Sequence, residues 1–219
     1  MRKIYKIIIA LIVVAVLLIV AIGYALKPAD PIVNEDRVSN IDESLDLIQV
    51  NKDILKTVRL EDRKLNASLE MNDDLFKKIL KNTLVNANNQ KLQEASINLD
   101  QDEILMKYPR KLGPWDTQVD VRMKAEDKDG RLVLTVNDVK LGKIKVKNSV
   151  FMKKFEKMIE GKNNIVSTEG DRIYVNLKSS NVSIDKIRLK DSILKIDFSF
   201  TKENLINIGG DIIGSLLTF

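Results

Sequence analysis

The stretch that decides the fold is WDTQVDVRMKAEDKDGRLVLTVNDVKLGKIKV, residues 115–146. Its less polar side chains recur at every second position on both sides of Asp129-Gly130: Thr117, Val119, Val121, Met123, Ala125, Leu132, Leu134 and Val136. A period of two is typical of a strand with one buried face, and Asp-Gly is a favoured hairpin turn. The stretch therefore predicts a long antiparallel hairpin. After a bend at 139–143, the alternation resumes at Ile144 and Val146.

Similar patterns extend in both directions along the chain. Alternation predicts further strands at 64–71, from 95 to 99, and at 165–168, 172–177, 182–189 and 193–201. Apolar spacing of three and four residues predicts helices at 75–88, capped by Asn72-Asp73-Asp74, and at 149–160, ended by Gly161. A short helix capped by Asn40 and a loose amphipathic helix at 203–219 are also expected. The predicted fold class is α+β, with a curved antiparallel sheet packed on two or three helices.

The N-terminus carries an uncharged apolar run of 20 residues, at positions 7–26. At about 1.5 Å per residue it spans about 30 Å, the hydrocarbon thickness of a bilayer. Basic residues precede the run at positions 2, 3 and 6, so the positive-inside rule predicts that residues 1–6 are cytoplasmic. We therefore expect a single-pass membrane protein with a transmembrane anchor at 7–26, a linker at 27–40 and an extracytoplasmic domain at 41–219. The alternative is a signal peptide cleaved after Ala25, but its apolar core would usually be only about 7–15 residues long.

Composition narrows the function classes. The 219 residues include no His and no Cys, which excludes thiolate metal sites, Cys nucleophiles and Ser-His-Asp triads. Residues 1–26 supply +3 of the net charge of +5, so the rest of the chain carries only +2 and is not expected to bind nucleic acid. We predict no enzyme activity, no metal and no cofactor. A hydrolase that uses carboxylates alone is the remaining catalytic hypothesis, and no particular pair of acids stands out.

Two sets of residues are candidates for binding. Apolar side chains could line a groove for an acyl chain, or they could simply form the core: Phe76, Leu80, Met123, Leu134, Phe151, Phe155, Ile196 and Phe198. Lysines could attract lipid headgroups or an anionic wall polymer, or they could form a solvated face: Lys143, Lys145, Lys147, Lys153 and Lys154.

Three segments resemble the YpmS-like membrane-anchored proteins of Gram-positive bacteria. They are NDDLFKKIL at 72–80, the stretch 115–146 with its RLVLTVNDVKLGKIKV portion, and VSIDKIRLKDSILKIDFSF at 182–200. The resemblance covers about residues 55–200. It implies a relation to tubular lipid-binding domains and to LmeA-like phospholipid-binding proteins, in which a curved sheet wraps a helix around an acyl-chain groove. It supplies no site residues.

These observations lead to two expectations about function. The first is a membrane-anchored extracytoplasmic domain of the cell envelope that binds a lipid or a lipid-linked envelope precursor in an apolar groove. The second is a structural or protein-interaction ectodomain with no small-molecule ligand, whose partner is an envelope protein or a wall polymer. A continuous apolar cavity would favour the first, because a filled core leaves no room for an acyl chain.

Overall fold

The computed structural model describes residues 2–41, 47–61, 64–86, 93–128, 131–159, 166–175 and 182–200. Its helices are α1 (Arg2–Leu26), the 3-10 turns η1 (Asn34–Asp36) and η2 (Val38–Asn40), α2 (Leu47–Lys56), α3 (Asp73–Asn86) and α5 (Asn148–Ile159). Its strands are β1 (Arg59–Glu61), β2 (Lys64–Met71), β3 (Ser96–Asp100), β4 (Glu103–Leu112), β5 (Trp115–Lys128), β6 (Arg131–Leu141), β7 (Ile144–Val146), β8 (Val166–Glu169), β9 (Arg172–Val175), β10 (Val182–Lys190) and β11 (Ile193–Phe200). The α+β class is confirmed.

All described strands join one sheet, and every pair in it is antiparallel. The main path runs β1-β2-β11-β10-β5-β6-β9-β8, and the predicted β5–β6 hairpin lies at its centre. Hairpin β3–β4 pairs with β5, and β7 pairs with β6. The central hairpin therefore holds the other strands together.

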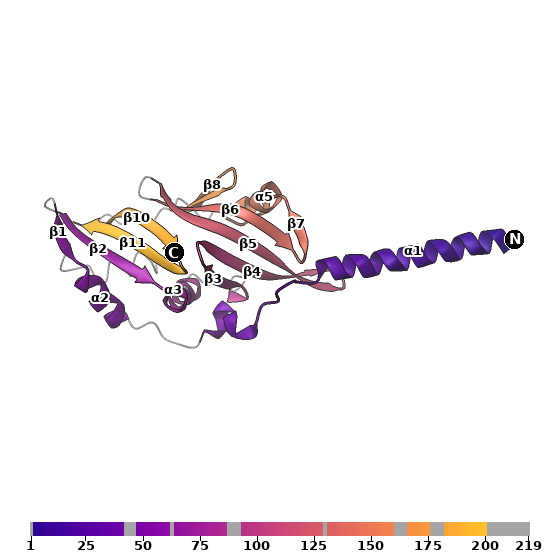
Figure 1. The fold of residues 1–219 in the computed structure, drawn as a ribbon, viewed down its shortest axis with the longest axis horizontal. Coiled ribbons are helices and arrows are strands. Elements are labelled where there is room, and N and C mark those ends of the chain that lie inside the picture. Colours follow the sequence, from indigo (N-terminus) through magenta and orange to yellow (C-terminus); the bar gives the residue numbers. More distant parts are fainter. Residues whose placement is uncertain are drawn as a thin grey trace.

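Two hairpins meet tip to tip along one edge of β5 (Figure 1). Hairpin β3–β4 pairs there up to Lys124, and hairpin β10–β11 begins its pairing at Glu126. Their turns are joined by hydrogen bonds, because the Ser192 N–H donates to the Gln101 carbonyl at 2.8 Å and the Gln101 N–H donates to Ser192 Oγ at 2.9 Å. This end-to-end arrangement lengthens the sheet.

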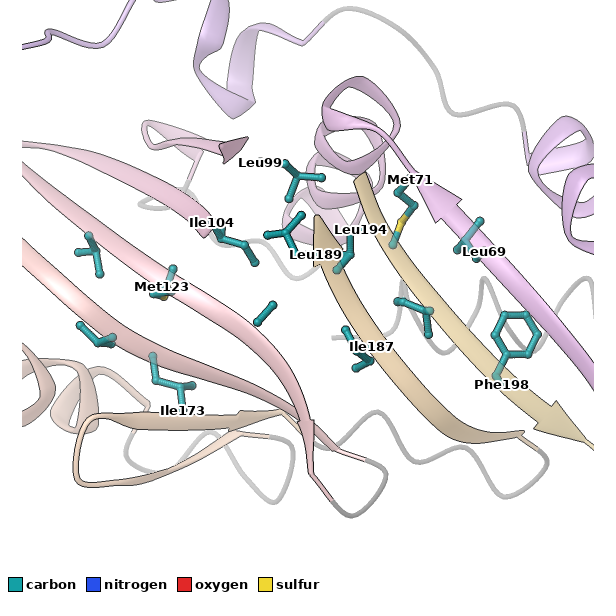
Figure 2. Packing of buried hydrophobic residues seen from close by; sticks show 14 of the residues in the cluster. Leu69, Met71, Leu99, Ile104, Met123, Ile173, Ile187, Leu189, Leu194 and Phe198 are labelled. Atoms are coloured by element: carbon teal, nitrogen blue, oxygen red, sulfur yellow. The ribbon is translucent and has the colours of Figure 1, made fainter. Parts of the chain in front are cut away.

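One face of the sheet carries the main hydrophobic core. Register aligns its side chains in rows across β2, β11 and β10, and one row joins Leu69, Ile196 and Ile187. Leucines from the two abutting hairpins come together where the turns meet, with Leu99 on one side and Leu189 on the other (Figure 2). The core therefore continues across the junction between the hairpins.

Two β-bulges keep this face apolar. On β6, Asn137 is an extra residue, because Arg122 pairs with Asp138 while Met123 pairs with Val136. On β10, Asp185 is extra in the same way. A bulge shifts the alternation by one position, so apolar side chains return to the core face after each one.

The helices match the sequence patterns over the described residues. Asn72 caps α3, since the Leu75 N–H donates to Asn72 Oδ1 at 2.9 Å. Helices α2 and α3 pack on β2, and α3 also packs on β3, whereas α5 packs on β6 and β8. Asn40 belongs to η2, and its side chain donates to the Asn34 carbonyl. Residues 42–46, which include most of the short helix that Asn40 was expected to cap, lie outside the described residues. The turn at 129–130, Gly161 and the expected helix at 203–219 lie outside the described residues.

Strand β4 is a strand that the alternation did not predict. It contains Pro109, which cannot donate to a sheet and usually occurs at edges. Pro109 lies beyond Lys107, whose pairing with Ser96 is the end of the β3–β4 ladder, and it faces Gln118 across the β4–β5 pairing. The proline is accommodated because no β3 residue pairs with that part of β4.

Helix α1 projects away from the sheet along the long direction of the molecule (Figure 1). Its large apolar side chains between Ile12 and Val20 are 51–63% exposed. The side chains of this helix are described from residue 12 onward. Among the residues whose side chains are described, no helix is long and apolar enough to cross a membrane.

Candidate functional site

Most of the predicted groove residues fall in one hydrophobic cluster. Met123, Ile196 and Phe198 are only 5%, 6% and 3% exposed, so they are core residues in this structure. Four others are half-buried and pack against that core: Phe76, Leu134, Phe151 and Phe155. Leu80 is half-buried on α3 and is not part of the cluster. The face is therefore filled at its centre and more accessible toward the helices.

Helix α5 presents a pair of aromatic rings to the sheet. Phe151 and Phe155 are one helical turn apart, and their ring centroids lie 6.0 Å from each other in a stacked arrangement. Both rings are half-buried against the core, as is Leu134 on the neighbouring strand β6. Among the predicted groove residues, these two supply a pair of adjacent aromatic rings that are only partly buried.

The five candidate lysines are all exposed, but they do not form a single patch of unpaired charge. Lys145 lies 2.9 Å from Asp138, and its ammonium group holds the pKa of that carboxyl below its usual value. The Lys143 ammonium forms a cation–π contact with Tyr24, and its Nζ lies 3.4 Å from the ring centroid. Lys147 follows β7, and Lys153 and Lys154 lie on α5. Lys143 therefore belongs to the contact between the sheet and α1.

The end of α1 is fastened to the sheet by hydrogen bonds. The last carbonyls of a helix have no partner within it. Here the Ala25 carbonyl accepts from the Lys143 N–H at 2.8 Å, and the Leu26 carbonyl accepts from the buried Thr117 hydroxyl at 2.6 Å. Two carbonyls that the helix leaves unpaired are therefore bonded to the sheet, and these bonds attach the end of α1 to β5 and the β6–β7 turn.

Two glycines allow this close approach. A Cβ added to Gly142 would lie 2.2 Å from the Leu26 carbonyl oxygen, and Gly142 also has a positive φ of +60°. A Cβ on Gly23 would lie 2.9 Å from Nε1 of Trp115. Backbone and indole therefore occupy the space that side chains would otherwise fill.

A polar cluster holds the segment that follows α1. The buried Gln118 side chain donates to the Asp30 carbonyl and accepts from the Ile32 N–H, both at 3.0 Å. Lys107 forms an ion pair with Asp30. Burial raises the pKa of the adjacent Asp120 carboxyl, and the negative charge of Asp30 adds to that rise against the opposing effects of Gln118 and Lys107.

The sequence did not predict the contacts that attach the end of α1 and residues 27–40 to the sheet. Residues 27–40 were expected to be a linker, yet Val38 is 1% exposed and its N–H donates to the Ala95 carbonyl at 2.9 Å. The available signals were weak: a Thr-Gln pair in a strand, and a glycine within a lysine-rich bend. Neither indicates contact with residues that lie about 90 to 120 positions earlier in the chain.

The described acids are not arranged as a metal site, because no group of three or more is close enough to hold an ion. Arg122 lies 2.8 Å from Asp100 and 3.3 Å from Glu103, and hydrogen bonding to Asp100 raises the arginine pKa further. These contacts fasten β3 and β4 to β5.

Comparisons with known proteins found no match among the family models, the curated proteins or the solved structures. The resemblance to YpmS-like proteins therefore stays a prediction.

Proposed function

We propose that this is a single-pass membrane protein whose extracytoplasmic domain binds a lipid or a lipid-linked envelope precursor against the apolar sheet face. The anchor is residues 7–26, with the N-terminus in the cytoplasm. The exposed apolar side chains of α1 support this, because a helix that is apolar on its outer surface needs a non-aqueous environment. The basic residues at positions 2, 3 and 6 set the orientation.

The observation that carries the binding proposal is the stacked Phe151–Phe155 pair on α5. These rings and Leu134 are half-buried at the border of a continuous apolar core. An acyl chain lying between α5 and β6 would extend that core. Burying about a dozen methylenes at about 0.8 kcal/mol each contributes about 10 kcal/mol before ordering costs.

The test is native mass spectrometry of the full chain released from detergent, followed by extraction and identification of retained lipid. We expect one stoichiometric lipid in the wild type, lost in Phe155→Asp. Val150→Asp is the matched control, because Val150 lies on the same helix and is 46% exposed. Leu134→Trp provides a second test, since a larger apolar side chain would block the site without adding charge. Equal retention in all four proteins would contradict the proposal.

The alternative function is a structural or protein-interaction ectodomain. The low exposure of Met123, Ile196 and Phe198 supports it, because side chains exposed by 3–6% leave little surface for a ligand. Under this alternative the wild type binds no stoichiometric lipid. Its partner would be an envelope protein or an anionic wall polymer, identified by crosslinking in intact cells.

A further inference from the structure

Two turns of the sheet lie beside the end of α1. The β4–β5 turn, residues 112–115, reaches the helix at Gly23, where Trp115 packs against the glycine. The β6–β7 turn, residues 141–144, reaches it at Tyr24 through the Lys143 ammonium group. These contacts place both turns alongside the last turns of α1 (Figure 1).

The position of the turns follows from the anchor. If residues 7–26 span the hydrocarbon layer, positions 23 and 24 lie at its boundary with the headgroups. Trp115 and Lys143 touch those positions, so they lie at the same depth. Direct contact with α1 therefore fixes the depth of the turns.

The chemistry of the turns suits that boundary. Leu112 is 39% exposed and Ile144 is 43% exposed, and each lies in the last residue pair before its turn. Tryptophan, which has an apolar body and a polar N–H, is enriched at membrane interfaces. The segments 24–27, 110–116 and 141–145 together contain five basic residues and one acidic residue. Two of the basic residues are paired with acids, Lys111 with Asp116 and Lys145 with Asp138. The remaining basic groups are attracted to anionic lipids.

We infer that these two turns form a second membrane contact, a foot that rests in the headgroup layer of the bilayer that α1 enters. The inference rests on the proposed membrane anchor. Leu112 and Ile144 reach toward the acyl boundary, and the basic side chains face lipid phosphates. The bilayer is the expected partner of the foot, because the two turns lie at the depth where α1 leaves the hydrocarbon layer.

Trp115 is the only tryptophan of the chain, so its fluorescence reports on the foot alone. The full chain is reconstituted into vesicles of phosphatidylcholine and phosphatidylglycerol that carry bromine at a shallow or a deep acyl position. We expect stronger quenching by shallow bromine than by deep bromine, and weak quenching by iodide in the buffer. Strong iodide quenching with no bromine quenching would overturn the inference.

A variant pair checks that the turn itself makes the contact. Leu112→Asp should reduce bromine quenching of Trp115 and increase its accessibility to iodide. Leu60→Asp is the matched control, because Leu60 is also exposed, at 58%, but lies on β1 at the end of the domain far from α1 (Figure 1). Equal quenching in the two variants, both folded by circular dichroism, would show that the turn does not enter the interface.

Flotation of the same vesicles separates the two proposals. A chain that floats with the vesicles while Trp115 remains accessible to iodide retains the anchor and overturns the foot. A chain that does not float at all overturns the anchor, and the foot with it.

Discussion

The carboxyl of Asp120 is half-buried, and its ionisation lowers the stability of the folded protein. Its pKa is raised mainly by burial, so the folded protein holds this proton at pH values where the unfolded chain has lost it. The resulting destabilisation is absent below the ordinary carboxyl value of 3.8 and grows as the pH rises through the folded pKa.

We therefore predict that Asp120→Asn increases the free energy of unfolding at neutral pH. The amide oxygen can still accept the hydrogen bond from Gln118. Urea denaturation at neutral pH and near pH 3.8 measures the effect, and the gain should shrink at the lower pH. Asp116→Asn, at an exposed carboxyl of the same strand, should change stability little. A gain that is independent of pH would contradict this account.

At this scale, the sequence predicted which side chains point into the core but not how completely each is covered. Alternation placed Met123 and Phe198 on the apolar face, and both are there. Whether such a side chain lines a groove or lies within a filled core depends on what packs above it. That packing is long-range, and a period of two carries no information about it.

Among the elements, α3 offers a direct test of capping. Asn72 accepts the Leu75 N–H, one of the amides that the helix itself leaves unpaired. Asn72→Ala should lower the free energy of unfolding by about 1 kcal/mol. Asn72→Ser should lower it much less, because serine is also a good N-cap residue. Urea denaturation of the three proteins measures both values. An alanine variant as stable as the wild type would show that the cap contributes nothing.

The bulges and β4 mark the limit of prediction at the element scale. The shift of apolar positions from Val136 to Val139, and from Ile184 to Ile187, is visible in the sequence and corresponds to the extra residues Asn137 and Asp185. Pro109, in contrast, hides a strand rather than revealing one. A proline argues against a strand unless the neighbouring strands are known, and the sequence does not show which strands lie beside β4.

At the scale of the whole molecule, Gly142 controls how α1 is attached. We predict that Gly142→Ala loosens the attachment, because the new Cβ would meet the Leu26 carbonyl. Hydrogen exchange at the Lys143 amide, which donates to Ala25, should become faster, while exchange at core amides such as Val121 should not change. Gly113→Ala is the control, since its φ is also positive, at +57°, but nothing lies within 4 Å of its added Cβ. Similar exchange rates at Lys143 in both variants would contradict the prediction.

The pairing of distant strands could not be predicted. Strand β2 has the same alternating pattern as several others, and nothing local indicates that its neighbour is the last described strand. Loop closure and packing decide such choices. The attachment of α1 was hidden for the same reason, since Thr117 and Leu26 come together only after folding.

The β2–β11 pairing also determines the order in which the chain can fold. Leu69 pairs with Ile196, so β2 is synthesised long before its partner exists. The central β5–β6 hairpin and the β3–β4 hairpin beside it involve only near neighbours and can form as the chain emerges. Until β11 arrives, one edge of β2 is an unpaired apolar strand, which is a template for aggregation. The nascent chain therefore needs shielding at residues 64–71 until β11 has been synthesised.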